Sequence, residues 1–150
     1  MQVTHPSLQV MHRMFDKGFS TGNDAIVDEL CSPDLVEHQF GLAGAGAEAI
    51  AHVKAAIRDV HSAVPDMRFT IEDSVVDGDR VWVRVRGRGT NTGTFFGPPS
   101  GQPVDITVFD QARIIDGRIV EHWGVPTGSR CSRRPVCSRA WAERTPADPE

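Results

Sequence analysis

The sequence contains no tyrosine, only three cysteines and no long apolar run. The absence of tyrosine excludes an oxyanion hole built on a phenol hydroxyl. An odd number of cysteines favours free thiols, although Cys131 and Cys137 could form a bridge if they were oxidised, leaving Cys31 free. No paired C-x-x-C is present, and the nearest histidine to the later cysteines is His122. We therefore expect no metal site.

The charge and hydropathy of the chain exclude further classes of function. The net charge of −4 is mild and gives no electrostatic reason to expect a nucleic acid or an anionic membrane as a partner. No apolar stretch approaches the roughly 18 residues of a membrane-spanning helix. The first 15 residues lack the basic start and apolar centre of a signal peptide. We expect one domain with one core, and a cytoplasmic location.

Three- and four-residue spacing of apolar side chains predicts helices in the first half of the chain. Residues 5–20 predict a short amphipathic helix with Leu8, Met11 and Phe15 on one face. A second helix is predicted from a cap at Asn23 or Asp24 to a stop at Pro33. Residues 34–42 are predicted to pass from this helix end into a short extended piece. A third helix is predicted to end at Pro65, with its apolar face formed by Ile50, Val53, Ile57, Val60 and Val64.

From Met67 onward, the apolar period changes from 3.6 to 2 residues, which is typical of strands. The Asp77-Gly78 and Asp116-Gly117 pairs each lie between alternating runs and predict two hairpins. A loop rich in glycine and proline, with Phe95 and Phe96, separates the hairpins. Helices followed by antiparallel strands predict an α+β domain, with one twisted sheet wrapped around the long helix and a cavity between them.

Alternation also predicts which side chains share a face of the sheet. Val81, Val83 and Val85 are expected on one face, and Trp82, Arg84 and Arg86 on the other. The second set has two interpretations. It is either a subunit interface or a site where a buried arginine binds a substrate carboxylate or enolate.

Several segments together resemble one family. They are EHQFG with GAEAI, the stretch PDMRFTIEDSVVDGDRVWVRVRGRGTNTGTFFGPPSGQPV and the closing VDITVFDQARIIDGRIVEHWGVP, and they cover most of Asp34 to Pro126. This pattern resembles the SnoaL-like polyketide cyclases, which belong to the NTF2-like, ketosteroid-isomerase-like superfamily. The resemblance implies an α+β, NTF2-like (cystatin-like) cone with N-terminal helices packed in a curved antiparallel sheet. It also implies a homodimer through the sheet and no metal, flavin or nicotinamide cofactor.

Asp110 is the first candidate for acid/base chemistry. It occupies the first position of the family's Asp-x-x-Arg pattern, where some cyclases have a pocket histidine. Alternation puts Val108, Asp110 and Ala112 on one face, so the carboxyl group would be desolvated, which suits proton transfer. The alternative is a sheet carboxylate paired with Arg84, Arg86 or Arg113.

Two histidines are further candidates for catalysis. The resemblance puts His38, in LVEHQF, at the mouth of a pocket, where an imidazole can donate to or accept from a carbonyl. The alternative for His38 is a surface or capping role. His122 shares strand parity with Gly124, which stands where the cyclases have a catalytic aspartate, so His122 could act as the base instead. Trp123 has the opposite parity and is expected in the core or an interface, unless a bulge turns it toward the pocket.

Candidate residues for binding a substrate are apolar: Phe15, Phe40, Val108, Ala112 and Trp123. The phenylalanines also have a structural interpretation, because Phe15, Phe19, Phe40 and Phe109 are predicted in the core. Phe15 and Phe40 could still line an apolar cavity.

The predicted function is to bind or convert an apolar polyketide- or terpenoid-like small molecule. If the protein is an enzyme, we expect cofactor-free cyclisation or isomerisation, with Asp110 as proton shuttle and His38 or His122 polarising a carbonyl. One alternative is an inactive binding or accessory protein of the same fold. Another is an epoxide hydrolase-like enzyme, although Gly124 removes the natural position for its second carboxylate. Without tyrosine, the oxyanion hole of the ketosteroid isomerases cannot be copied.

The resemblance stops after Pro126, so we predict a SnoaL-like domain at 1–126 and an atypical basic tail at 127–150. Residues 128–150 contain five arginines against three acidic residues, and they show no helical or strand period. Relatives usually continue with Val-Pro-Asp and an amphipathic helix. One G placed before the Thr127 codon in a back-translated gene restores such a helix, so we hypothesise a frameshift. A genuine disordered or arm-like tail is the alternative, and sequencing the gene decides between them.

Overall fold

The computed structural model describes residues 5–94 and 98–127. The predictions for Phe95, Phe96, Cys131, Cys137 and the basic tail therefore lie outside the described residues. Within the described part, helices precede a six-stranded sheet whose order is β2-β1-β6-β5-β4-β3. The strands are β1 (Cys31–Glu37), β2 (Gly44–Ala45), β3 (Arg68–Asp77), β4 (Arg80–Thr90), β5 (Pro103–Ile115) and β6 (Arg118–Pro126). The helices are α1 (Pro6–Arg13), the π-helix η1 (Met14–Phe19), α2 (Ile26–Leu30) and α3 (Ala47–Ala63).

The first two helices differ in detail from the prediction. The helix expected over residues 5–20 is present but widens into η1, where Ser20 N donates to Phe15 O over 2.9 Å. The cap of α2 is Ala25, which provides no side-chain hydrogen bond, so a cap at Asn23 or Asp24 is wrong. Pro33 is not the stop either, because α2 ends at Leu30 and β1 begins directly after it. Pro33 lies where the β1–β6 register is irregular, and there its missing N–H costs no ladder bond.

Both predicted hairpins are confirmed. The turn between β3 and β4 contains Gly78 with φ of 59°, and the turn between β5 and β6 contains Asp116 and Gly117 with φ of 51° and 75°. Two consecutive left-handed residues match the twist of the strands they join. The hairpins place β3 to β6 side by side in an antiparallel meander.

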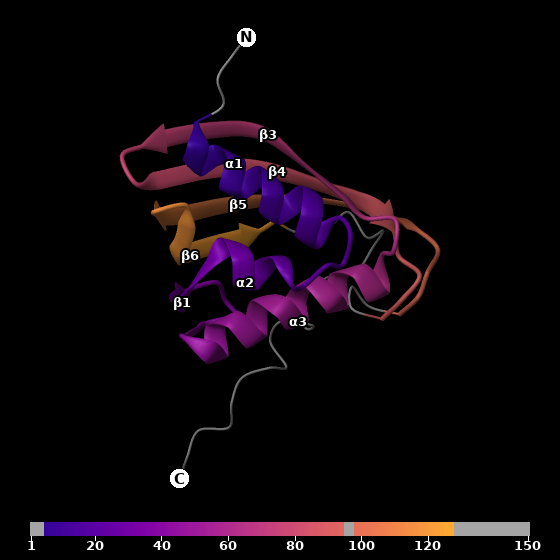
Figure 1. Ribbon diagram of the computed structural model, residues 1–150. Helices are drawn as coiled ribbons and strands as arrows, with labels where there is room; N and C mark the ends of the chain where they lie inside the picture. Colours follow the sequence, from indigo (N-terminus) through magenta and orange to yellow (C-terminus); the bar gives the residue numbers. More distant parts are fainter. Residues whose placement is uncertain (1–4, 95–97, 128–150) are drawn as a thin grey trace.

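The β1 strand departs from a purely antiparallel sheet. It pairs in parallel with β6, and Glu37 lies opposite His122. Figure 1 shows β1 reaching the sheet beside β6, below the long β3–β5 strands. This pairing joins two segments far apart in the sequence, and it positions the polar groups described below.

The core lies between the helices and one face of the sheet. Helix α3 contributes Val53, Ile57 and Val60, and β4 contributes Val81, Val83 and Val85, as alternation predicts. Phe15 is buried, and its ring centroid lies 5.7 Å from that of Phe69 on β3. Figure 1 shows α1 and α3 lying on the same side of the curved sheet. The predicted α+β domain is confirmed, with a mixed rather than a purely antiparallel sheet. No helix of the described part is long and apolar enough to cross a membrane.

Candidate functional site

Asp110 lies on β5 and points toward the core side of the sheet. Its cross-strand partners are Val83 on β4 and Gly124 on β6. Only 7% of its side chain is exposed. The alternative of an arginine partner is wrong, because the nearby arginines bind other carboxylates on the outer face: Arg84 to Glu72, Arg86 to Asp105 and Arg113 to Asp79. A buried carboxylate without an arginine partner needs another cation to offset its charge.

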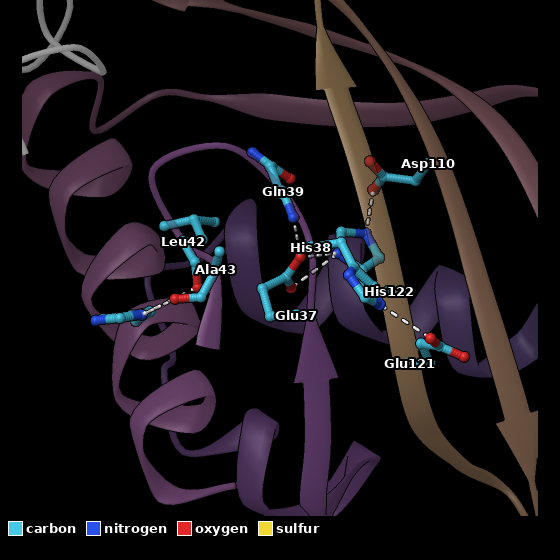
Figure 2. A network of polar contacts seen from close by, with 9 residues as sticks. Glu37, His38, Gln39, Leu42, Ala43, Asp110, Glu121 and His122 are labelled. Carbon is cyan, nitrogen blue, oxygen red and sulfur yellow. Dashed lines mark hydrogen bonds and ion pairs between the residues drawn. The ribbon is translucent and has the colours of Figure 1, made fainter. Parts of the chain in front are cut away.

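His122 is that cation. Its Nε2 atom lies 3.3 Å from Oδ2 of Asp110. Its Nδ1 atom lies 2.9 Å from Oε1 and 2.8 Å from Oε2 of Glu37. The imidazole is therefore held between two carboxylates from two different strands, as Figure 2 shows. An imidazolium donates from both nitrogens, so this arrangement satisfies both of its N–H groups.

Glu37 is the residue of this site that the sequence analysis missed. It is the last residue of β1, and only 2% of its side chain is exposed. Its Oε1 atom also accepts a hydrogen bond of 2.9 Å from the backbone N–H of Gln39. Alternation along β1 places Leu35 and Glu37 inward, so the strand pattern contained the signal. That signal was lost because residues 34–42 were expected to begin at a helix end.

The two carboxylates decide the charge of His122. Burial alone lowers the pKa of an imidazole, because it penalises the charged form. Here the charge and hydrogen bond of Asp110, followed by those of Glu37, outweigh burial and raise the pKa of His122 to about 10. At neutral pH, His122 is therefore an imidazolium, and it is a poor candidate for a general base.

The two oxygens of Asp110 have different surroundings. Oδ2 faces the imidazolium, whereas Oδ1 is buried and has no hydrogen-bond partner among the described residues. A buried acceptor without a partner costs free energy, so such an atom is a marker for function. Oδ1 is therefore the carboxylate oxygen of this cluster that does not face the imidazolium.

His38 lies apart from this cluster. Its Nε2 atom lies 2.9 Å from Oε1 of Glu121, and its ring stacks on Trp123 with centroids 4.4 Å apart. Glu121 and Trp123 flank His122 on β6, so their side chains lie on the opposite face of the sheet. The structure thus brings Asp110 and His122 together but places His38 and Trp123 on the outer face.

The other predicted substrate-binding residues are divided between core and surface. Phe15 and Ala112 are buried, and Val108 packs against the core beside them. Ala112 lies opposite His122, so it is part of the wall around the imidazole. Phe40 is 64% exposed, and its prediction as a core residue is wrong, because the chain bends outward after β1. Phe109 is also exposed rather than in the core, since it has the parity opposite to that of Asp110.

The cluster has the composition of an acid/base site. Within residues 5–94 and 98–127, no group of three or more His, Cys, Asp or Glu side chains is arranged to hold a metal ion. His122 instead joins Glu37, through a hydrogen bond, to Asp110, through an ion pair, and this chain of contacts ends at a carboxylate oxygen without a hydrogen-bond partner among the described residues. A chain of this kind orients the terminal carboxylate and can supply a base on an apolar face.

Comparison with known proteins assigns the family. The model of the SnoaL-like polyketide cyclases matches residues 9–130. The chain belongs to the SnoaL-like polyketide cyclase family. No curated protein sequence gives a match.

Solved structures of similar proteins have the same architecture, which confirms the NTF2-like fold. IdmH from Streptomyces antibioticus, named as a candidate polyketide cyclase, is 31% identical, with a TM-score of 0.69. The match covers 81% of this chain and 92% of IdmH. TsrD from Streptomyces laurentii is 27% identical over 83% of this chain and 91% of its own, with a TM-score of 0.70. AclR from Streptomyces galilaeus, named as a candidate hydroxylase, is 23% identical over 96% of this chain and 89% of its own, and its TM-score of 0.70 supports the fold alone.

Proposed function

We propose that this protein is a SnoaL-like enzyme that uses cofactor-free acid/base chemistry on an apolar polyketide- or terpenoid-like molecule. The observation that carries the proposal is the buried Asp110, with one oxygen facing the imidazolium of His122 and the other without a hydrogen-bond partner among the described residues. Family membership and the name of IdmH support a cyclisation. A cyclase of this kind needs a base beside an apolar surface, and Val83, Val108 and Ala112 form such a surface around Asp110.

The proposed step begins at a carbon between or beside carbonyl groups. Oδ1 of Asp110 takes a proton from this carbon, and the electron pair of the C–H bond forms an enolate. The enolate carbon attacks a second carbonyl of the same molecule, which forms a carbon–carbon bond and an alkoxide. The alkoxide then takes the proton back from Asp110, so the enzyme ends in its starting state.

In this scheme, His122 keeps its proton throughout. Its imidazolium holds Asp110 through Oδ2 and offsets the charge of two buried carboxylates. Glu37 fixes the ring orientation through Nδ1, as an orienting carboxylate does in other hydrogen-bonded chains. His122 therefore takes the role of a positioning residue rather than that of the base.

Turnover of aromatic polyketide esters that carry a β-keto side chain tests the proposal. We expect the wild-type protein to convert such an ester to a cyclised product and Asp110→Asn to abolish conversion. Asp79→Asn is the matched control, because Asp79 is paired with Arg113 on the outer face. Full activity of Asp110→Asn would exclude Asp110 as the base.

Two further measurements on the wild-type protein separate the alternative functions. Gly124, at the position of the family's catalytic aspartate, favours the inactive binding protein as the second candidate. Binding of the ester without any turnover by the wild type would support that candidate. Incorporation of oxygen from labelled water into the diol formed from an epoxide would support the epoxide hydrolase.

We also propose that the protein is a homodimer through the outer face of the sheet. Exposed apolar side chains lie there on four adjacent strands: Val75, Trp82, Phe109 and Val125. A cluster of this kind on a soluble protein marks an interaction surface. Pairs of opposite charge, Glu72 with Arg84 and Asp105 with Arg86, flank it. Both signs on one patch suit a second copy related by a two-fold axis.

A further inference from the structure

Because Gly124 has no side chain, the amide of Gln39 fits into the space beside Asp110. A Cβ atom at this position would lie 2.1 Å from Oε1 and 2.9 Å from Cδ of Gln39, and 2.7 Å from Oδ1 of Asp110. Distances under 3.0 Å do not occur for real Cβ contacts, so any side chain at position 124 would push Gln39 or Asp110 away. The amide of Gln39 thus fills the volume where a side chain of residue 124 would begin.

The backbone around Gln39 is fixed. Its N–H donates to Oε1 of Glu37 over 2.9 Å, and its carbonyl accepts from the N–H of Leu42 over 2.9 Å. The N–H of His38 donates to the carbonyl of His122 over 2.9 Å, which ties the segment to β6. Figure 2 shows Gln39 beside Glu37, above the end of β1. These hydrogen bonds fix the backbone that carries the Gln39 side chain, and they place this side chain beside Glu37 and His122.

The amide and Oδ1 of Asp110 lie on the same side of Gly124. Oε1 of Gln39 and Oδ1 of Asp110 lie 2.1 and 2.7 Å from the position that a Cβ atom of residue 124 would occupy, so both border the same small volume. Oδ1 has no hydrogen-bond partner among the described residues. Two acceptor oxygens that border the same volume cannot hydrogen-bond to each other. The two ends of a side-chain amide have nearly the same shape, so a half-turn places the Nε2 hydrogens toward Oδ1 without any other movement.

We propose that Gln39 is the positioning residue for Oδ1 of Asp110, and that Gly124 is required because it admits the Gln39 amide. In the resting protein, the Nε2–H group donates to Oδ1 and holds the carboxylate in the orientation for proton transfer. The Gln39 amide thus occupies the space of the aspartate that the family resemblance places at position 124. The effect on turnover rests on the proposed function of Asp110, whereas the contact itself does not.

Side-chain amide resonances in a nitrogen-15 NMR spectrum test the contact directly. The Gln39 pair is identified by its loss in Gln39→Met, and the exposed Gln102 provides the reference position in the same spectrum. We expect one Nε2 proton of Gln39 to lie downfield of the Gln102 protons in the wild type. It should return toward them in Asp110→Ala and in Gly124→Ala. Coincidence of the Gln39 and Gln102 resonances in the wild type would overturn the proposal, whether or not the variants fold.

Kinetics of a β-keto polyketide ester test the positioning role. We expect Gln39→Met, which keeps the length but removes the donor, to lower kcat by about tenfold to a hundredfold, with KM changed by less than about threefold. Gln102→Met should retain wild-type kcat. An unchanged kcat in Gln39→Met would overturn the role in turnover.

The two measurements separate this inference from the proposed function. A Gln39–Asp110 contact in a wild type that converts no ester would overturn the proposed function and support the contact. Asp110-dependent turnover without the contact would overturn the Gln39 inference and leave the proposed function standing.

Discussion

Nδ1 of His122 lies 2.8 Å from Oε2 of Glu37, a residue 85 positions earlier in the chain. This hydrogen bond joins the end of β1 to the middle of β6 across their parallel pairing. It fixes the ring so that Nε2 faces Asp110. The relationship links the stability of the sheet to the orientation of the proposed base, and the following predictions depend on it.

Glu37→Gln is expected to destabilise the folded protein by on the order of 3 kcal/mol, because it removes one partner of a buried ion pair. The pKa of His122 should fall from about 10, since part of its rise comes from Glu37. Urea unfolding and an NMR titration of the imidazole measure both effects. Glu121→Gln is the matched control, because Glu121 bonds to the more exposed His38, and it should cost less than about 1 kcal/mol. Equal losses in both variants would contradict this account.

Stability should fall as pH rises from about 6.5 toward 10. The pKa of His122 is raised from 6.5 in the unfolded chain to about 10 in the folded protein. Its contribution is therefore complete below pH 6.5 and is lost as the pH approaches 10. Between about pH 7 and 8.5, the free energy of unfolding should decrease by up to about 1.4 kcal/mol per pH unit relative to His122→Gln. Parallel pH profiles for the wild type and this variant would argue against a buried imidazolium.

Cys31 is expected to be inert toward thiol reagents in the folded protein. It is a buried free thiol, as the odd cysteine count predicts. Burial, followed by the charges of Glu37 and Asp28, raises its pKa to about 12, although Arg118 opposes this. Peptide mapping after iodoacetamide treatment at pH 8 should find Cys31 unmodified in buffer and modified in urea. Rapid modification in buffer would show that the start of β1 opens.

Trp82→Glu is expected to convert the proposed homodimer to a monomer, because it buries a charge in the centre of the outer face. Analytical ultracentrifugation measures the change in mass. Phe40→Glu is a suitable control, since it places the same charge on an exposed phenylalanine near the end of β1. A monomeric wild type would exclude this interface.

Local signals were sufficient to predict most of the fold. Asp77-Gly78 and Asp116-Gly117 define the hairpins, and period-2 alternation identifies the inner valines of β4. The same alternation placed Asp110 on the inner face, and the structure confirms this. These features depend on neighbours in the sequence, so a pattern of a few residues contains them.

The site itself depends on pairing that no local pattern contains. Glu37 becomes a partner of His122 only because β1 runs parallel to β6, and the Gln39 amide occupies the space beside Gly124 only because residue 124 has no side chain. His38 drew attention as an imidazole near a helix end, yet one step of strand parity turns it to the outer face and brings its neighbour Glu37 inward. Because β1 begins at Cys31, Glu37 rather than His38 points into the core.

Proton abstraction by Asp110 is the central claim, and the most direct test measures deuterium uptake at the acidic carbon of a β-keto polyketide ester in deuterium oxide. The wild type and Asp79→Asn should accelerate uptake equally. Asp110→Asn should lower the catalysed rate by about a hundredfold to ten-thousandfold, and His38→Gln should lower it little, because His38 lies on the outer face. Uptake by Asp110→Asn at the wild-type rate would contradict the account.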